Sequence, residues 1–198
     1  MTSEIVVSDY DPDWPVWFET VRACVWPVLC DTAIRIEHVG STAVAGLAAK
    51  PIIDMDIVVG SEHEVGPVIE RLASIGCLWR GDLGVAGREA FGPVPGESLP
   101  AHHLYLVVEN NRAHLDHWLL RDMLEEDPAA RQEYAALKRR NAELAKGDFD
   151  LYVAAKANFV ARLLARGREA RELPPVTCLL YTSPSPRDGL LSRMPSSA

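Results

Sequence analysis

Hydrophobic residues recur with two different periods along the chain, and these periods predict its elements. Apolar positions from Asp13 to Leu29 repeat at helical spacing, with a proline in the first turn, so we expect an amphipathic helix there. A second helix is predicted from Ser61 to Ile75, ending at Gly76. Short apolar runs predict strands at 4–8, 34–39 and 52–59, with a short helix at 43–48.

The pattern changes after the second helix. Between Cys77 and Glu109 it favours β structure punctuated by glycines, and three helices are then expected at about 112–125, 128–145 and 148–169. Because helices and strands are interspersed, the predicted fold class is α/β (α+β): a mixed β-sheet flanked by helices, with a helical C-terminal segment.

A single domain is expected over residues 1–173, because 198 residues suit one core. Residues 174–198 are rich in proline and serine and show no apolar face. The string at 178–188 resembles translated sequencing-adapter read-through, so we interpret this tail as non-native or disordered. A flexible linker or docking tail is the alternative.

Two carboxylates in the strand at 52–59 are the first candidates for chemistry. Asp54 and Asp56 alternate with apolar residues, so both point from one face of the strand. A buried, unpaired carboxylate is costly, and a divalent cation is a natural partner. A structural alternative is an ion pair with Lys50 or Arg35.

A glycine-containing corner precedes that strand. Gly40, Ser41 and Thr42 follow an apolar strand and open a segment predicted to be helical. Backbone N–H groups at such a corner are well placed to bind phosphate oxygens. The two hydroxyl side chains could instead cap the helix, and both roles are compatible.

These residues carry a resemblance to a known family. Gly-Ser followed by Asp-x-Asp in an apolar strand resembles the signature of the nucleotidyltransferase superfamily, and the string 38–56 resembles its GrpB family. The likeness extends over roughly residues 4–165, through Gly87-Arg88, His102–Tyr105, Arg121-Asp122, and Tyr134 with Lys138. It departs at 125–127, which are acidic here where the family tends to be basic, and the strand expected at 102–108 contains no third carboxylate.

The resemblance implies a nucleotidyltransferase-like sheet and a Mg²⁺- or Mn²⁺-dependent transfer of a nucleoside monophosphate from a nucleoside triphosphate to an unknown hydroxyl acceptor. Asp54, Asp56 and Ser41 are the candidate catalytic residues, and Asp54 and Asp56 the metal ligands. The candidate nucleotide-binding residues are Gly40, Ser41, Thr42, Lys50, Arg88, His103, Tyr105 and Arg121. A non-catalytic nucleotide-binding or sensor module of the same fold is the alternative, so the sequence leaves enzymatic activity open.

Several of these residues also have structural interpretations. Arg121 could form an internal salt bridge that clamps a helix to the sheet. Tyr134 and Lys138, one helical turn apart, could lie on a solvated helix face. His114 and His117 could pair at a zinc ion, although no Cys or Glu stands at a recognisable ligand spacing.

Bulk properties narrow the classes of partner and compartment. The net charge of −8 argues against an extended nucleic-acid surface, and no apolar run reaches the ~20 residues that span a bilayer. The first residues lack the pattern of a signal peptide. Four cysteines without a Cys-x-x-Cys pair or a disulfide spacing are expected to be mostly buried, which favours a reducing, cytoplasmic setting.

Overall fold

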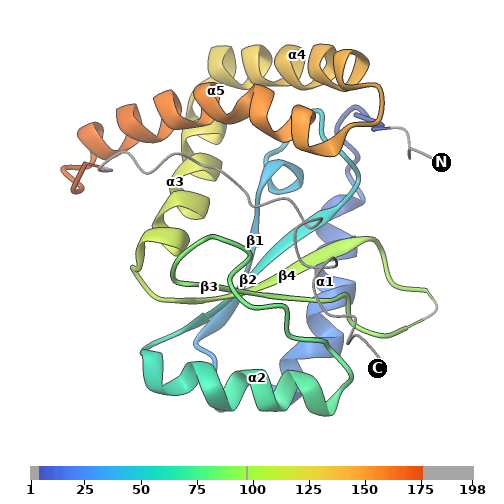
Figure 1. Cartoon of the computed structure of the whole chain (residues 1–198), viewed down its shortest axis with the longest axis vertical. Coiled ribbons are helices and arrows are strands. Elements are labelled where there is room, and N and C mark those ends of the chain that lie inside the picture. The colour runs from blue at the N-terminus through green and yellow to red at the C-terminus, as the bar shows by residue number, and fades with distance from the viewer. Residues whose placement is uncertain (1–4, 97, 176–198) are drawn as a thin grey trace, which may run out of the picture.

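A four-stranded mixed sheet forms the centre of the protein. The structure is a computed structural model that describes residues 5–96 and 98–175 (Figure 1). The sheet order is β1-β2-β4-β3, and β2 runs parallel to β4 while the two outer strands pair antiparallel. Its strands are β1 (Arg35–Val39), β2 (Ile53–Val59), β3 (Arg88–Phe91) and β4 (His102–Val108). The predicted α/β class with a mixed sheet is therefore confirmed.

One face of the sheet is covered by two helices. These are α1 (Trp14–Val25), continued by the 3₁₀ turn η1 (Trp26–Val28), and α2 (Val65–Ser74), preceded by the 3₁₀ turn η3 (Glu62–Glu64). Their apolar stripes pack on the odd-numbered side chains of β2 and form the main core, which includes Trp14, Val21, Val25, Val68, Leu72, Ile53, Met55 and Ile57.

Three helices lie on the opposite side. They are α3 (Arg112–Glu126), α4 (Pro128–Ala145) and α5 (Phe149–Ala170), and α4 and α5 run side by side beyond α3 in Figure 1. Asn111, Asp127 and Asp148 cap their N-termini through side-chain oxygens. A second apolar cluster, which includes Leu119, Met123, Tyr134, Phe159 and Leu163, joins the three helices. All three lie within one residue of their predicted positions.

The first third of the chain differs from the expectation in three places. The predicted helix to Leu29 splits into α1 and η1, because Pro27 has no N–H to continue the α-helical ladder. The helix expected at 43–48 is wrong, since the 3₁₀ turn η2 (Ser41–Ala43) is followed by an extended Val44 and by Gly46 at φ 77°. Of the strand expected at 4–8, the described residues 5–8 form one bridge, Ser8 to Ala49.

Two further expectations concern the tail and the cysteines. Most of the predicted tail, residues 176–198, lies outside the described residues. Cys24 and Cys30 are exposed and only Cys77 is buried, which corrects the expectation of mostly buried thiols in the described part of the chain. None of the helices described is long and apolar enough to cross a membrane.

Candidate functional site

Asp54 and Asp56 lie on the central strand β2, on the sheet face away from α1 and α2. In the sheet register Asp54 stands opposite His103 of β4, and Asp56 opposite Tyr105. The two carboxylates differ in access: the side chain of Asp54 is 32% exposed, whereas that of Asp56 is fully buried. Only Asp54 is therefore open to a ligand without rearrangement.

The glycine corner lies directly against Asp54. Gly40 adopts φ 71° and ψ −165°, a conformation that side chains other than glycine's rarely tolerate. A Cβ placed on Gly40 would lie 3.0 Å from the Cβ of Asp54 and closer still to its Oδ2. The chain therefore brings the corner and the first carboxylate into contact, and glycine is needed for that approach.

The hydroxyl of Thr42 links this corner to the sheet through two hydrogen bonds. Thr42 is buried, and its Oγ1 donates to the carbonyl of Ile52 (3.3 Å). Because that bond uses the hydroxyl proton, Oγ1 accepts from Nε2–H of His38 (3.0 Å). Burial is the main reason that the pKa of His38 falls to about 4. The Thr42 side chain thus points into the protein, which leaves its backbone and the half-buried Ser41 for a ligand.

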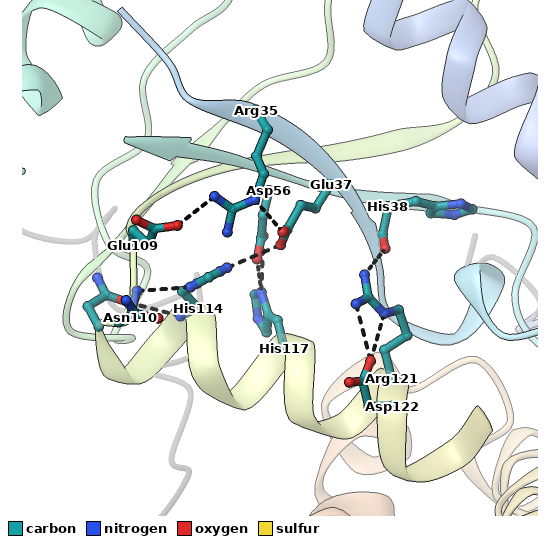
Figure 2. A network of polar contacts seen from close by, with 11 residues as sticks. Arg35, Glu37, His38, Asp56, Glu109, Asn110, His114, His117, Arg121 and Asp122 are labelled. Atoms are coloured by element: carbon teal, nitrogen blue, oxygen red, sulfur yellow. Dashed lines mark hydrogen bonds and ion pairs between the residues drawn. The ribbon is translucent and has the colours of Figure 1, made fainter. Parts of the chain in front are cut away.

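Each aspartate accepts a hydrogen bond from a histidine. Nδ1 of His103 lies 2.8 Å from Oδ1 of Asp54. Nδ1 of His117 lies 3.0 and 2.9 Å from the two oxygens of Asp56, as Figure 2 shows. Burial opposes the ionised form of Asp54, but the hydrogen bond from His103 and nearby positive charge outweigh it and lower its pKa. Burial likewise opposes the charged form of His117, yet Asp56 raises its pKa.

A third acid, which the sequence reasoning missed, lies on the same face. Glu37 of β1 stands opposite Asp56 in the register and accepts from Nε of Arg35 (2.7 Å) and Nε2 of His114 (3.1 Å) (Figure 2). Burial would raise its pKa, but these two partners hold it at about 2. The alternation of charged and apolar residues in 34–39 was the signal that could have placed it there.

The two other acids near the sheet bond to partners away from Asp54 and Asp56. Glu109 accepts from Nη1 of Arg35 (2.6 Å), and Glu89 accepts from Nε1 of Trp79 (2.7 Å). Within the described residues, no group of three or more His, Cys, Asp or Glu side chains has a geometry that could hold a metal ion. A cation at this site would therefore use the two aspartates together with ligand oxygens.

The candidate cations lie in three places around the aspartates. The guanidinium of Arg88 lies 4.3 Å from the ring centroid of Tyr105, next to Asp56 in the register. Arg121 pairs with Asp122 inside α3 (3.1 Å) and donates to the carbonyl of His38 (3.3 Å). It therefore ties α3 to β1 through this hydrogen bond, and not through the salt bridge that was expected. Lys50 is half-buried, and burial is the main reason that its pKa falls to about 8.

The helices α4 and α5 bring further polar residues toward this region. Tyr134 and Lys138 are each 2% exposed, so the solvated helix face expected for them is wrong. The zinc interpretation of His114 and His117 also fails, because the two rings contact different acids, Glu37 and Asp56. The burial of Lys138 could not be expected from the sequence, because lysine side chains are rarely buried.

Comparisons with known proteins agree with this architecture. The family described as GrpB protein matches residues 4–166. The chain is 32% identical over 151 residues to YqkA of Bacillus subtilis, covering 76% of this chain and 43% of YqkA, so it spans less than half of that relative. It is 29% identical over 164 residues to the glutamate-rich protein GrpB of Alkalihalophilus pseudofirmus, covering 81% and 94% of the two chains.

A solved structure supports the same assignment at the level of the fold. The crystal structure of the conserved protein GrpB from Enterococcus faecalis superposes with a TM-score of 0.73 at 28% identity, covering 84% of this chain and 99% of that one. The family match spans most of the residues that the structure describes, including the corner, β2 and α3. The chain therefore belongs to the GrpB family.

Proposed function

We propose that this protein is a Mg²⁺-dependent nucleotidyltransferase that transfers a nucleoside monophosphate from a nucleoside triphosphate to a hydroxyl acceptor. The observation that carries the proposal is the contact between the Gly40 corner and Asp54. It puts a set of backbone N–H donors, suited to phosphate, beside an accessible carboxylate, suited to a divalent cation.

Each residue of the site has a role that follows from its position. The N–H groups of Ser41 and Thr42 would hold phosphate oxygens, and Asp54 would hold Mg²⁺ or Mn²⁺ with Asp56 as the second ligand. A bound cation would supply positive charge beside the phosphate oxygens. In the transfer the acceptor oxygen would bond to the α-phosphorus, its proton would pass to solvent, and the bond to the departing pyrophosphate would break. Arg88, held over Tyr105, would stabilise the negative charge of the departing group.

A nucleotide-binding module without turnover is the second candidate. It is favoured by the register of β4, which places His103 and Tyr105, and no acid, opposite the two aspartates. It is favoured further by His117, which donates to both oxygens of Asp56. The same ligand would bind in both cases, and only the release of pyrophosphate separates them.

Calorimetry with ATP, GTP, CTP and UTP, with and without Mg²⁺, tests the shared part of the two candidates. Asp54→Asn is expected to weaken Mg²⁺-dependent binding at least about tenfold, because it removes the accessible charge. Asp31→Asn is the matched control, since Asp31 pairs with Arg71 and belongs to an exposed ion pair away from the site.

A pyrophosphate-release assay with a mixture of hydroxyl acceptors then separates the candidates. Release by the wild type that is lost in Asp54→Asn supports the transferase, and tight Mg²⁺-dependent binding without release supports the binding module. If Asp54→Asn binds every nucleotide as well as Asp31→Asn does, both candidates are wrong.

A further inference from the structure

Three lysines gather on the side of Asp54 that faces α4 and α5. Lys138 belongs to α4, Lys156 to α5, and Lys50 stands just before β2. Nζ of Lys50 and Nζ of Lys156 lie 5.4 and 5.2 Å from the same ring centroid, that of Tyr152. Nζ of Lys138 lies 4.4 Å from the ring centroid of Tyr134. The three amino groups thus lie close to two tyrosine rings, Tyr134 of α4 and Tyr152 of α5.

Two buried donors of α4 lack an acceptor. Lys138 is 2% exposed and Asn141 is 5% exposed, and they share the inward stripe of α4. Among the residues that the structure describes, neither Nζ of Lys138 nor Nδ2 of Asn141 has a hydrogen-bond partner. Buried donors without acceptors cost free energy, and a ligand that supplies acceptor oxygens would remove that cost.

The charges around these donors favour an anion. Burial, followed by the repulsion from Lys156 and Arg139, lowers the pKa of Lys138 to about 6, while Asp54 acts in the opposite direction. The pKa of Lys50 falls for the same kinds of reason, burial first and then Lys156. Amino groups that repel one another in a partly dry environment are stabilised by a multivalent anion placed among them.

From these contacts we infer that Lys138 and Asn141, together with Lys50 and Lys156, bind the di- or triphosphate end of a nucleotide. This inference rests on the proposed function, because it assumes that the ligand reaches from Asp54 toward α4. Asn141 would donate to a phosphate oxygen, and the amino groups would neutralise its charge. The α4–α5 pair then forms part of the ligand site and does more than cover the sheet.

Binding of inorganic pyrophosphate in the presence of EDTA tests this site without the metal. We expect the wild type to bind and Lys138→Met to bind about tenfold more weakly or worse, because a charged hydrogen bond is lost. Asn141→Ala is expected to weaken binding severalfold. Arg140→Met is the matched control, since it removes one positive charge from the exposed side of α4 and is expected to bind like the wild type.

Methionine is chosen because an apolar side chain of similar length fills the buried position, so the variant is expected to fold. A melting temperature at least equal to that of the wild type verifies this. If Lys138→Met folds and still binds pyrophosphate as tightly as Arg140→Met, or if the wild type does not bind it at all, the inference is overturned.

Proton uptake gives a second readout that a merely structural lysine would not produce. With its pKa lowered to about 6, the free amino group of Lys138 is expected to be mostly neutral at about pH 7.5, and a bound phosphate would favour its charged form, so binding should take up about one proton. Calorimetry in two buffers of different ionisation enthalpy measures this uptake, which should fall by most of a proton in Lys138→Met, since Lys50, with a pKa of about 8, contributes only the smaller part. Uptake that is unchanged in this variant contradicts the role of Lys138.

Comparing Asp54→Asn with Lys138→Met separates this inference from the proposed function. If pyrophosphate binding in EDTA depends on Lys138 while no nucleotide shows Mg²⁺-dependent binding or turnover, the phosphate site stands and the proposed function fails. If Asp54-dependent nucleotide binding is observed but Lys138→Met has no effect on either ligand, the proposed function stands and this inference fails.

Discussion

Replacing Gly40 by alanine tests the contact on which the proposed function depends. The added Cβ would lie against the Cβ and Oδ2 of Asp54, so the carboxylate would have to move or the corner would have to open. The positive φ of Gly40 adds strain to any other residue. Gly46→Ala is the matched control, because Gly46 also has a positive φ (77°) but its added Cβ would meet nothing within 4 Å.

The expected loss of stability can be worked from these two features. The strained backbone costs about 1–3 kcal/mol, and moving Asp54 weakens its partly exposed bond to His103 by about 1 kcal/mol more. Gly40→Ala should therefore destabilise the fold by about 2–4 kcal/mol, which lowers the melting temperature by about 5–15 °C in a domain of this size. Gly46→Ala should cost only about 1–2 kcal/mol.

Thermal melts and Mg²⁺-dependent nucleotide binding are measured for both variants and for Gly40→Ala combined with Asp54→Ala. Since removing the carboxylate removes the nearest clash, the double variant should be more stable than the sum of the single effects by about 1 kcal/mol. Equal melting temperatures for Gly40→Ala and Gly46→Ala, together with additive single effects, would refute the contact.

Two further predictions concern pH. The pKa of Glu37 is lowered from 4.5 to about 2, so the stability that it contributes is present above about pH 4.5 and is lost as the pH falls toward 2. Glu37→Gln should therefore lower the free energy of unfolding at neutral pH by up to about 3 kcal/mol. In urea unfolding, the variant should also lose less stability than the wild type between about pH 4.5 and 2. The pKa of Lys138 is lowered from 10.5 to about 6, so the unfolded chain binds more protons and stability rises with pH across this interval. Lys138→Met should lose that slope. At pH 7 its free energy of unfolding, measured with urea, should exceed that of the wild type by about 1–4 kcal/mol. A wild-type stability that falls between pH 7 and 9 contradicts the buried lysine.

The sequence predicts best those elements whose ends carry their own signals. The boundaries of α3, α4 and α5 are marked by Asn111, Asp127 and Asp148, whose side chains cap the first turns, and by a proline at 128. The aspartate strand is equally clear, because Asp54 and Asp56 interrupt a strongly apolar run. In all these cases the interactions that determine the element lie within one short segment, so the sequence of that segment is enough to predict it.

Other features depend on contacts that are distant in the sequence. His117 lies 61 residues from Asp56 and His114 lies 77 residues from Glu37, so neither pairing follows from spacing. The residue type of Lys138 predicts an exposed helix face, yet the tertiary structure places it among the buried residues of α4. The wrong helix at 43–48 has a similar cause, because Val44 and Leu47 pack into the α3–α5 cluster. The N–H groups of Val44 and Leu47 donate to carbonyls only three residues back, those of Ser41 and Val44, so isolated turns form in place of an α-helix.

The position of α3 decides where a ligand can approach the sheet. Three residues on one side of this helix contact the two strands beneath it: His114 bonds to Glu37, His117 to Asp56, and Arg121 to the carbonyl of His38 (Figure 2). These contacts cover Asp56 and leave Asp54, which is 32% exposed beside an exposed His103. A cation would therefore bind first at Asp54, displacing a solvent-exposed histidine and not a buried one. Asp54 lies against the Gly40 corner and interacts electrostatically with Lys138 and Lys156, so a triphosphate bound at Asp54 would be attracted toward α4 and α5.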